Sequence, residues 1–368
     1  MLIGQSAPPD EVRALWVVRT SMTSPESIQR VVSLAERYGF NTILAQVRGR
    51  GDAYYRSSLE PRAQALAGQP ADFDPLRMLI DEARPRALQV HAWMNVFYVW
   101  SESRLPRSAQ HLVVRRPEWI ARDLRNRYQM TTRGRVEGIY MCPSNPNLRA
   151  HTLKVYAEVA QRYPQLDGIH LDYVRYPNEE YCYCSGCLAR FRTTVYKQVS
   201  AQRAHALDRQ TRRGNRLAWV QALPNEWNRW RRQQVSLFVQ AFQKQSRQIN
   251  PRLILSSAVW PQPQLARERK LQDWQDWFQR GWLDVLFPMA YERDTGVFEQ
   301  RIRTVLALAE GRPVVAGVGA WLISPESARN KIRVARQLGA RGYCLFSYDS
   351  ITQLGSDPSY LEQLVEGA

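Results

Sequence analysis

Short apolar runs alternate with amphipathic stretches along most of the chain. Each run covers only a few residues between turn or capping residues, which predicts β-strands. The stretches between them carry apolar residues at helical spacing, as behind Ser24, a predicted N-cap that precedes Pro25 at the first helical position. The predicted strands span 12–18, 41–47, 88–96, 169–174, 253–259, 283–289, 313–318 and 342–348. The predicted helices span 25–35, 76–83, 148–162, 271–280, 298–309, 327–338 and 360–365, and residues 188–250 read as two helices broken near Gly214.

Eight strands separated by helices predict an α/β fold with a closed (β/α)8 barrel, because parallel strands need crossover connections. A doubly wound open sheet is the alternative, but the first strand lacks the glycine-rich turn of a nucleotide-binding version. We therefore predict one barrel domain over residues 11–368, preceded by a tail at 1–10. The long segments after the third and fourth strands, including 97–141, read as inserts in that barrel.

Composition and charge narrow the function classes. Hydrophobic residues make up 44% of the chain and aromatic residues 11%, enough for a large core. No apolar run reaches the roughly 20 residues of a membrane span, and the first ten residues do not read as a signal peptide. The net charge of +17 favours anionic partners. A nucleic-acid partner is disfavoured because the aromatic residues gather at strand ends and not among the arginine patches.

Three cysteines, Cys182, Cys184 and Cys187, crowd together in the segment after the fourth strand. Their spacing is compatible with a metal site completed by Cys142 or a histidine, with a disulfide, or with structural thiols, and the sequence leaves these open. The chemistry predicted for the barrel itself needs no metal and no cofactor, since no metal-binding histidine motif is present.

Polar and aromatic residues are concentrated where the predicted strands end. In a (β/α)8 barrel the functional residues lie at these carboxyl ends, so these side chains are predicted to share one pocket. Aromatic rings stack on sugars, and acids, amides and arginines pair with their hydroxyl groups, so the set indicates a carbohydrate site. The predicted substrate-binding residues are Trp16, Arg48, Asp52, Trp93, Asn95, His170, Arg175, Tyr176, Trp260, Tyr291, Trp321, Tyr348 and Asp349.

Hydrolysis of a glycosidic bond needs one protonated carboxyl group and one ionised carboxylate. Asp172 is predicted to be the ionised member because Arg175, three residues further along, should lower its pKa. Glu292 is the favoured proton donor, with Asp52, Asp294 and Asp349 as the other candidates at strand ends. The sequence does not choose between retention and inversion of configuration.

Taken in order, several of these segments resemble the glycosyl-hydrolase-like 10 family, long catalogued as domain of unknown function 187. The resemblance covers about residues 11–350, and one departure is Tyr173, where many members carry a second acid after the strand-four aspartate. The matching segments are RALWV at 13–17, FNTILAQVR at 40–48 with GD at 51–52, HAWMN at 91–95, DGIHLDYVRYP at 167–177, QDW at 275–277 with GWLD at 281–284, and FSY at 346–348.

This resemblance implies a (β/α)8 barrel, a secreted, periplasmic or envelope location in bacteria, and activity on polysaccharide. One branch of the family cleaves peptidoglycan glycan strands stripped of their stem peptides, and a more distant relative acts on partly deacetylated poly-N-acetylglucosamine. Denuded peptidoglycan keeps the lactyl carboxylates and is anionic, so it suits a chain of charge +17 better than a cationic glycan does. The alternatives are a hydrolase of another amino-sugar exopolysaccharide and a carbohydrate-binding barrel without catalysis.

Overall fold

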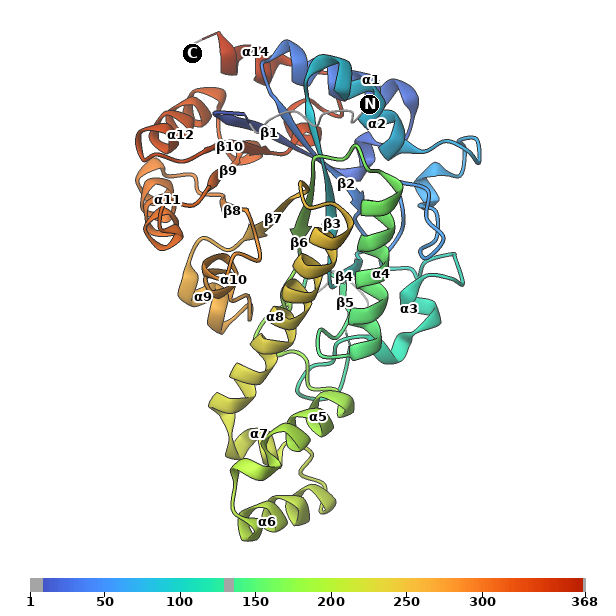
Figure 1. Cartoon of the computed structure of the whole chain (residues 1–368), viewed down its shortest axis with the longest axis vertical. Helices are drawn as coiled ribbons and strands as arrows, with labels where there is room; N and C mark the ends of the chain where they lie inside the picture. The colour runs from blue at the N-terminus through green and yellow to red at the C-terminus, as the bar shows by residue number, and fades with distance from the viewer. Residues whose placement is uncertain (1–8, 129–135, 367–368) are drawn as a thin grey trace.

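The structure, a computed structural model, describes residues 9–128 and 136–366 (Figure 1). Eight parallel strands close into a barrel in the order β1-β10-β9-β8-β7-β6-β3-β2, which confirms the predicted (β/α)8 fold. Residues 1–8 of the predicted tail and residues 129–135 of the predicted insert lie outside the described ranges. The barrel strands are β1 (Val12–Val17), β2 (Thr42–Arg48), β3 (Gln89–Asn95), β6 (Gly168–Asp172), β7 (Ile254–Val259), β8 (Val285–Ala290), β9 (Val315–Gly319) and β10 (Gly342–Phe346).

Helices surround the barrel and begin where the sequence places capping residues. The Ser24 side chain accepts from the backbone of Ser27, and Ser324 caps its helix in the same way, as predicted. The largest of these helices, α8, packs against α4 on the outside of the barrel (Figure 1). The surrounding helices are α1 (Pro25–Arg37), α2 (Pro75–Ala83), α4 (Pro146–Arg162), α8 (Pro224–Ile249), α9 (Pro263–Glu268), α10 (Trp274–Gln279), α11 (Thr295–Ala309), α12 (Pro325–Gln337), α13 (Tyr348–Ile351) and α14 (Ser359–Val365).

The insert after β3 contains short elements that the sequence pattern did not reveal. Strands β4 (Tyr98–Trp100) and β5 (Ile139–Tyr140) pair antiparallel, and α3 (Leu112–Arg115) lies between them in sequence. Figure 1 shows this pair below the barrel strands, at the end where β3 finishes. Elements of two to four residues are too short to produce a readable period.

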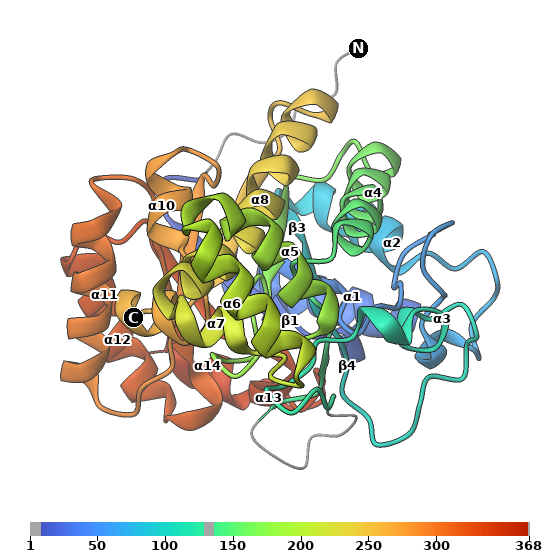
Figure 2. The same ribbon diagram turned by 90° about the horizontal axis from the view of Figure 1, so that it is seen from below.

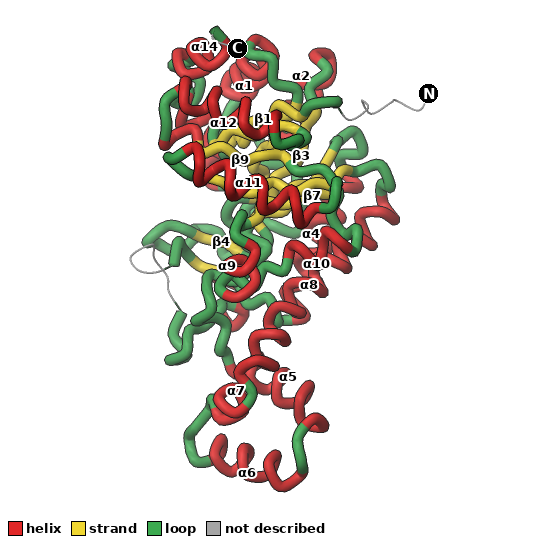
Figure 3. Tube along the Cα trace, turned by 90° about the vertical axis from the view of Figure 1, so that its left-hand side faces the viewer, coloured by secondary structure: helices red, strands yellow, loops and turns green. Residues whose placement is uncertain are grey.

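The insert after β6 forms a helical arm made of α5 (Ser185–Val195), α6 (Ala201–Arg212) and α7 (Ala218–Ala222), to which α8 returns. Figure 3 shows these three helices displaced from the barrel, around the far end of α8, and Figure 2 shows the same helices from below, in front of the barrel. The prediction of two helices over 188–250 is wrong, although the break near Gly214 is present between α6 and α7. Ser200 caps α6 and Pro224 begins α8, and these two signals create the additional breaks.

Inside the barrel, His170 and Asp172 share the inward face of β6, as their alternation with Ile169 and Leu171 predicts. The interior below the strand ends is filled by aromatic and aliphatic side chains, so the barrel is a packed core. None of the helices in the described ranges combines the length and apolar character needed to cross a bilayer.

Candidate active site

A cavity of about 540 Å³ opens at the carboxyl ends of the barrel strands. Nine of the residues predicted from strand ends line it, and they lie on or follow six of the eight barrel strands, β1, β3, β6, β7, β8 and β9. Aromatic rings form much of its wall, with three carboxyl groups and two guanidinium groups among them. The predicted residues that line the cavity are Trp16, Trp93, Asn95, Asp172, Arg175, Trp260, Tyr291, Glu292 and Trp321.

Asp172 ends β6 and is only 7% exposed. One carboxylate oxygen accepts from the backbone N–H of Tyr173 at 2.6 Å, and the other accepts from the indole N–H of Trp93 at 3.1 Å. Burial raises the pKa of Asp172 to about 6, and this effect outweighs the opposite influences of Arg175 and the two hydrogen bonds. The expectation of a lowered pKa is therefore wrong, because the effect of Arg175 is the smaller one.

Arg175 does not form a direct ion pair with Asp172 in the structure. Its guanidinium donates to the hydroxyl group of Tyr140 at 2.8 Å and lies 3.9 Å from a carboxylate oxygen of Glu137. The same guanidinium stacks on the ring of Tyr173, 4.4 Å from its centre. Arg175 thus ties the β5 segment to the end of β6 and acts on Asp172 only through space.

Tyr173 lines the cavity, although continued alternation along the strand would turn its side chain outward with those of Ile169 and Leu171. The strand ends at Asp172, and Tyr173 adopts the left-handed conformation with φ of 50°, which redirects its side chain. Its ring stacks on Tyr98 with 4.5 Å between ring centres. A tyrosine therefore stands at the cavity wall directly after Asp172.

Of the four acids considered as partners of Asp172, only Glu292 lines the cavity. It follows β8, is about one third exposed, and one of its oxygens lies 3.4 Å from the guanidinium of Arg301 on α11. The other three acids satisfy local backbone or side-chain donors. Asp294 accepts from Val297 N–H as the N-cap of α11, Asp349 accepts from Val18 N–H at the end of β1, and Asp52 accepts from Arg50 N–H.

Glu137 is a third acid at the cavity that sequence reasoning missed. It precedes β5 in the insert after β3, and its charge contributes to raising the pKa of Asp172. No strand-end pattern marks such a position, because the insert folds back over the barrel mouth. Further polar lining residues outside the predicted set include Arg19, Gln46, Tyr98 and Gln262.

Six predicted binding residues do not line the cavity. Arg48 is fully buried and forms a two-pronged ion pair with Glu60, at 2.6 and 2.7 Å. His170 lies below the cavity, where it accepts from the indole N–H of Trp16 at 3.2 Å and contacts the Ser256 hydroxyl at 2.9 Å. Burial keeps the pKa of His170 well below its usual value. The His170 ring is therefore neutral, and one of its nitrogens can accept the hydrogen bond from Trp16. The others are Asp52, Tyr176 and Tyr348, which are buried, and Asp349, which is partly buried.

Two carboxyl groups in one cavity can act as acid and base when their environments differ. Asp172 is buried among aromatic rings, whereas Glu292 is partly exposed beside an arginine. Within the described ranges, the His, Cys, Asp and Glu side chains close enough to share a metal ion are four cysteines outside this cavity.

Comparison with known proteins agrees with this geometry. The profile of a family described as glycosyl hydrolase-like 10 matches residues 11–316. The chain is 26% identical over 184 residues to the glycosyl hydrolase YngK of Bacillus subtilis (strain 168), covering 45% of this chain and 34% of that protein. It is 28% identical over 193 residues to the glycosyl hydrolase DigH of Escherichia coli (strain K12), covering 46% of this chain and 42% of that protein. The matched part thus spans less than half the length of either relative.

Among solved structures, the chain is similar to α-L-fucosidase isoenzyme 2 from Paenibacillus thiaminolyticus. The TM-score is 0.67 at 17% sequence identity, over 97% of this chain and 48% of the fucosidase chain. At this level of identity the similarity establishes the barrel fold and leaves the reaction to be argued from the cavity.

Proposed function

The chain belongs to the glycosyl hydrolase-like 10 family, and from this premise we propose that it hydrolyses glycosidic bonds of a bacterial envelope polysaccharide. The observation that carries the proposal is the environment of Asp172, a buried carboxyl group with a raised pKa in an aromatic cavity that it shares with Glu292. Glycoside hydrolysis requires such a pair of enzyme groups. One carboxyl group protonates the leaving oxygen, and one carboxylate attacks the anomeric carbon or activates a water molecule.

Asp172 is the proton donor in this proposal, and Glu292 is the ionised partner. A pKa of about 6 leaves a useful fraction of Asp172 protonated near neutral pH, while Glu292 is partly exposed and lies 3.4 Å from the guanidinium of Arg301. These roles reverse the sequence-based expectation, because burial and not Arg175 dominates the pKa of Asp172. Glu292 then either attacks the anomeric carbon or activates a water molecule.

The cavity wall supports a sugar ligand. Trp260, Tyr291 and Trp321 offer ring faces for stacking. Several buried polar atoms of cavity residues lack a hydrogen-bond partner in the described structure, and sugar hydroxyl groups would satisfy them. These atoms are Arg19 Nε, Asn95 Oδ1, Arg175 Nε and Trp260 Nε1.

The proposed substrate is the glycan strand of peptidoglycan after removal of its stem peptides, which fits a secreted or envelope-associated protein. Each muramic acid in such a strand keeps a lactyl carboxylate, so the ligand is anionic. Arg19 lines the cavity, donates to Gln46 at 2.8 Å, and forms no ion pair with a carboxylate of the described residues. Its guanidinium is therefore suited to receive a lactyl carboxylate.

The catalytic roles can be tested with amidase-treated glycan strands as substrate and released reducing ends as the readout. Asp172→Asn and Glu292→Gln are each expected to lower kcat at least about 100-fold, the usual contribution of an acid or base. Glu299→Gln on α11 is the matched control, because this exposed residue pairs only with Arg303 one helical turn away. Saturable glycan binding with no reducing ends released by the wild-type protein would instead favour a binding barrel.

A second experiment separates the two roles. An aryl glycoside whose leaving group needs no protonation should restore much of the activity of Asp172→Asn but not that of Glu292→Gln. Azide should restore activity to the variant that lacks the ionised carboxylate of the enzyme, here Glu292→Gln, because azide can act as the nucleophile in its place. The opposite pattern would return the roles to the sequence-based assignment, and rescue of Glu137→Gln in place of Glu292→Gln would identify Glu137 as the partner.

The substrate class is tested through Arg19. Arg19→Gln should lower kcat/KM on denuded peptidoglycan strands about tenfold, a loss of roughly 1.4 kcal/mol, while changing that for neutral chito-oligosaccharides much less. Equal losses on both substrates would contradict recognition of the lactyl carboxylate.

A further inference from the structure

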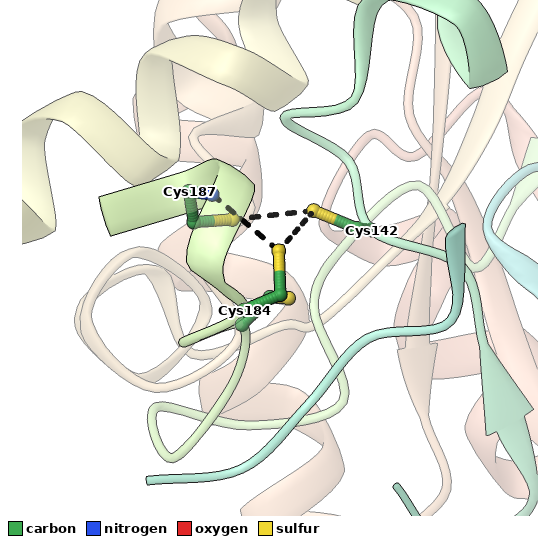
Figure 4. Close-up of side chains that lie close together, drawn as sticks. Cys142, Cys184 and Cys187 are labelled. Carbon is green, nitrogen blue, oxygen red and sulfur yellow. Dashed lines mark hydrogen bonds between the residues drawn. The ribbon is translucent and has the colours of Figure 1, made fainter. Parts of the chain in front are cut away.

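Four cysteines converge beside the candidate active site. The Sγ atoms of Cys142, Cys182, Cys184 and Cys187 all lie within 4.8 Å of one another. Cys142, Cys182 and Cys187 are buried, and Cys184 is partly buried. Figure 4 shows the sulfurs of Cys142, Cys184 and Cys187 directed toward a common point between two segments of chain.

The sulfur separations lie on both sides of the distance expected between ligands of one ion. The Cys142 and Cys187 sulfurs are 3.2 Å apart, and the Cys142 and Cys184 sulfurs are 3.9 Å apart. A tetrahedral zinc ion with Zn–S bonds of about 2.3 Å holds its sulfurs roughly 3.8 Å apart. All four cysteines are free thiols in the structure, and pairing them as disulfides would require sulfurs about 2 Å apart.

Backbone N–H groups are directed at the sulfurs, as expected around thiolate ligands. Cys187 N–H donates to the Cys184 sulfur at 3.4 Å, and Arg122 N–H donates to the Cys182 sulfur at 3.3 Å. The Ser144 hydroxyl lies 2.9 Å from the Cys187 sulfur and accepts from Arg190 at 2.9 Å. The cluster therefore has an outer layer of donors that suits negatively charged sulfur.

Arginines near the cluster, of which Arg231 is buried, form no ion pair with a carboxylate of the described residues. The guanidinium of Arg231 is buried and donates to the carbonyl oxygens of Glu179 and Tyr181 and to Asn228. In the described part of the chain it forms no ion pair, so no carboxylate neutralises it. Arg149 donates to Pro143 O and to Gln234 and likewise forms no ion pair with a carboxylate of the described residues. A buried cation requires a compensating negative charge.

We propose that Cys142, Cys182, Cys184 and Cys187 together bind one zinc ion as a structural site with four cysteine ligands. Four thiolates and Zn²⁺ carry a net charge of −2, which the three positive charges of Arg149, Arg190 and Arg231 more than offset. Four protein ligands leave no open coordination position, so the ion has a structural and not a catalytic role.

The site links the two inserts that frame the cavity. Cys142 follows β5, two residues after the Tyr140 that receives the hydrogen bond from Arg175. Cys184 is the N-cap of α5, where the helical arm begins. The zinc ion thus fixes the base of the arm to the wall that carries Glu137 and Tyr140, and holds that wall against the end of β6.

Metal content of the full-length protein tests the proposal directly. Protein purified without chelator is expected to contain one zinc ion per chain by elemental analysis. After unfolding in guanidinium with a chelator, all five cysteines should react with a thiol reagent. Metal-free protein would overturn the proposal, whether one reactive thiol reveals two disulfides or five reveal a thiol cluster. Iron in place of zinc would overturn the assignment of the ion.

Variants locate the site independently of activity. Cys142→Ser and Cys187→Ser should each lose most of the bound zinc, whereas Cys344→Ser, in the barrel interior, should retain it. Where a cluster variant fails to fold, cobalt exchange into the wild-type protein provides a second readout, because tetrahedral Co²⁺ bound by four thiolates has characteristic visible and charge-transfer absorption. Full zinc content in both cluster variants, or absence of the thiolate bands after cobalt exchange, would contradict the assignment.

Discussion

The burial of Asp172 lowers the stability of the folded protein when this carboxyl group is ionised, and it also supplies the raised pKa that a proton donor needs. Its pKa is raised from 3.8 to about 6 because burial disfavours the charged form. The folded protein therefore binds a proton on Asp172 in a pH range where the unfolded chain has lost it. Stability from this group is fully present below about pH 4 and is lost as the pH rises through about 6.

This linkage predicts the stability of Asp172→Asn. At pH 8 the variant should be more stable than the wild type by up to about 3 kcal/mol, since it removes a buried charge. The gain should shrink as the pH falls through about 6 and disappear below about 4. Urea unfolding of both proteins at several pH values measures it. A difference that does not change with pH would show that Asp172 has an ordinary pKa in the folded state.

The pH dependence of the activity should also report the protonation of Asp172, with the protonated form as the active one. Because the protonated form of Asp172 donates the proton in our proposal, kcat/KM should fall as the pH rises above about 6. A pH profile on denuded glycan strands measures this limb. An activity that rises through pH 6 and then stays constant would instead require ionised Asp172.

Arg48 and Glu60 form the clearest structural ion pair near the barrel mouth. Although burial raises the pKa of Glu60, Arg48 and His151 outweigh this and lower it to about 2. Glu60→Gln should therefore destabilise the protein by about 3–5 kcal/mol, because Arg48 is left buried without its counter-charge. The loss should be present at neutral pH and should decrease as the pH falls below about 4.5 toward 2.

Chemical denaturation measures this effect, and the double variant Arg48→Met/Glu60→Leu is the control. It should be markedly more stable than Glu60→Gln, since it removes both charges together. A Glu60→Gln variant as stable as the wild type would show that the pair contributes little.

Arg48 and Arg175 show which part of the site could be predicted. The sequence predicts both at strand ends, yet Arg48 pairs with Glu60 away from the cavity, and Arg175 lines the cavity. The difference depends on where each partner lies, and Glu60 and Glu137 both come from loops whose paths leave no pattern in the sequence. Strand ends were therefore predictable, while the depth of each side chain was not.

At the scale of elements, the short 3-10 turn Ala320–Leu322 after β9 presents Trp321 to the cavity. Trp321 is 44% exposed and packs edge-on against Tyr291 and Phe346, with 5.0 and 5.2 Å between the ring centres. Gly319 allows this close approach, because a Cβ there would lie 3.0 Å from the Trp321 ring and from Tyr291. The turn thus holds a large aromatic face open to solvent.

Trp321→Ala should raise KM for the glycan about tenfold with little change in kcat, because stacking contributes to binding more than to the chemical step. The fold should be unaffected, since the side chain is substantially exposed. Leu237→Ala, an exposed hydrophobic residue on α8, is the control. An unchanged KM for Trp321→Ala would place the sugar elsewhere in the cavity.

Elements with their own signals were predicted well and those defined by contacts were not. The eight barrel strands and the caps at Ser24 and Ser324 follow from apolar runs and capping residues. In contrast, β4, β5 and α9 are short and draw their stability from what they pack against. The prediction of one helix over 271–280 began too early for the same reason, since α10 starts at Trp274.

At the scale of the whole molecule, the four cysteines show how the fold joins distant segments. Cys142 lies 40 residues before Cys182 in the sequence, and only the return of the chain through α4 and β6 brings them together. The sequence presented three close cysteines and left the fourth ligand open, because a contact over this separation depends on the packing of two inserts.

Net charge acts on the molecule as a whole. The chain carries a formal charge of +17, while the cavity itself mixes arginines and acids. Long-range attraction should therefore speed the encounter with an anionic glycan, whereas local contacts decide how it sits. Such attraction between exposed charges is screened over about 10 Å at 0.1 M salt.

The salt dependence of turnover can distinguish an anionic substrate from a neutral one. On denuded peptidoglycan strands, kcat/KM should fall about tenfold between low and high ionic strength, because screening removes the steering contribution. On neutral chito-oligosaccharides it should stay nearly constant, since no charge on the ligand responds to the field. Parallel measurements with one enzyme preparation control for any effect of salt on the fold. Equal salt sensitivity on both substrates would mean that the positive charge acts on the enzyme itself and not on its substrate, and the preference for an anionic glycan would then rest on Arg19 alone.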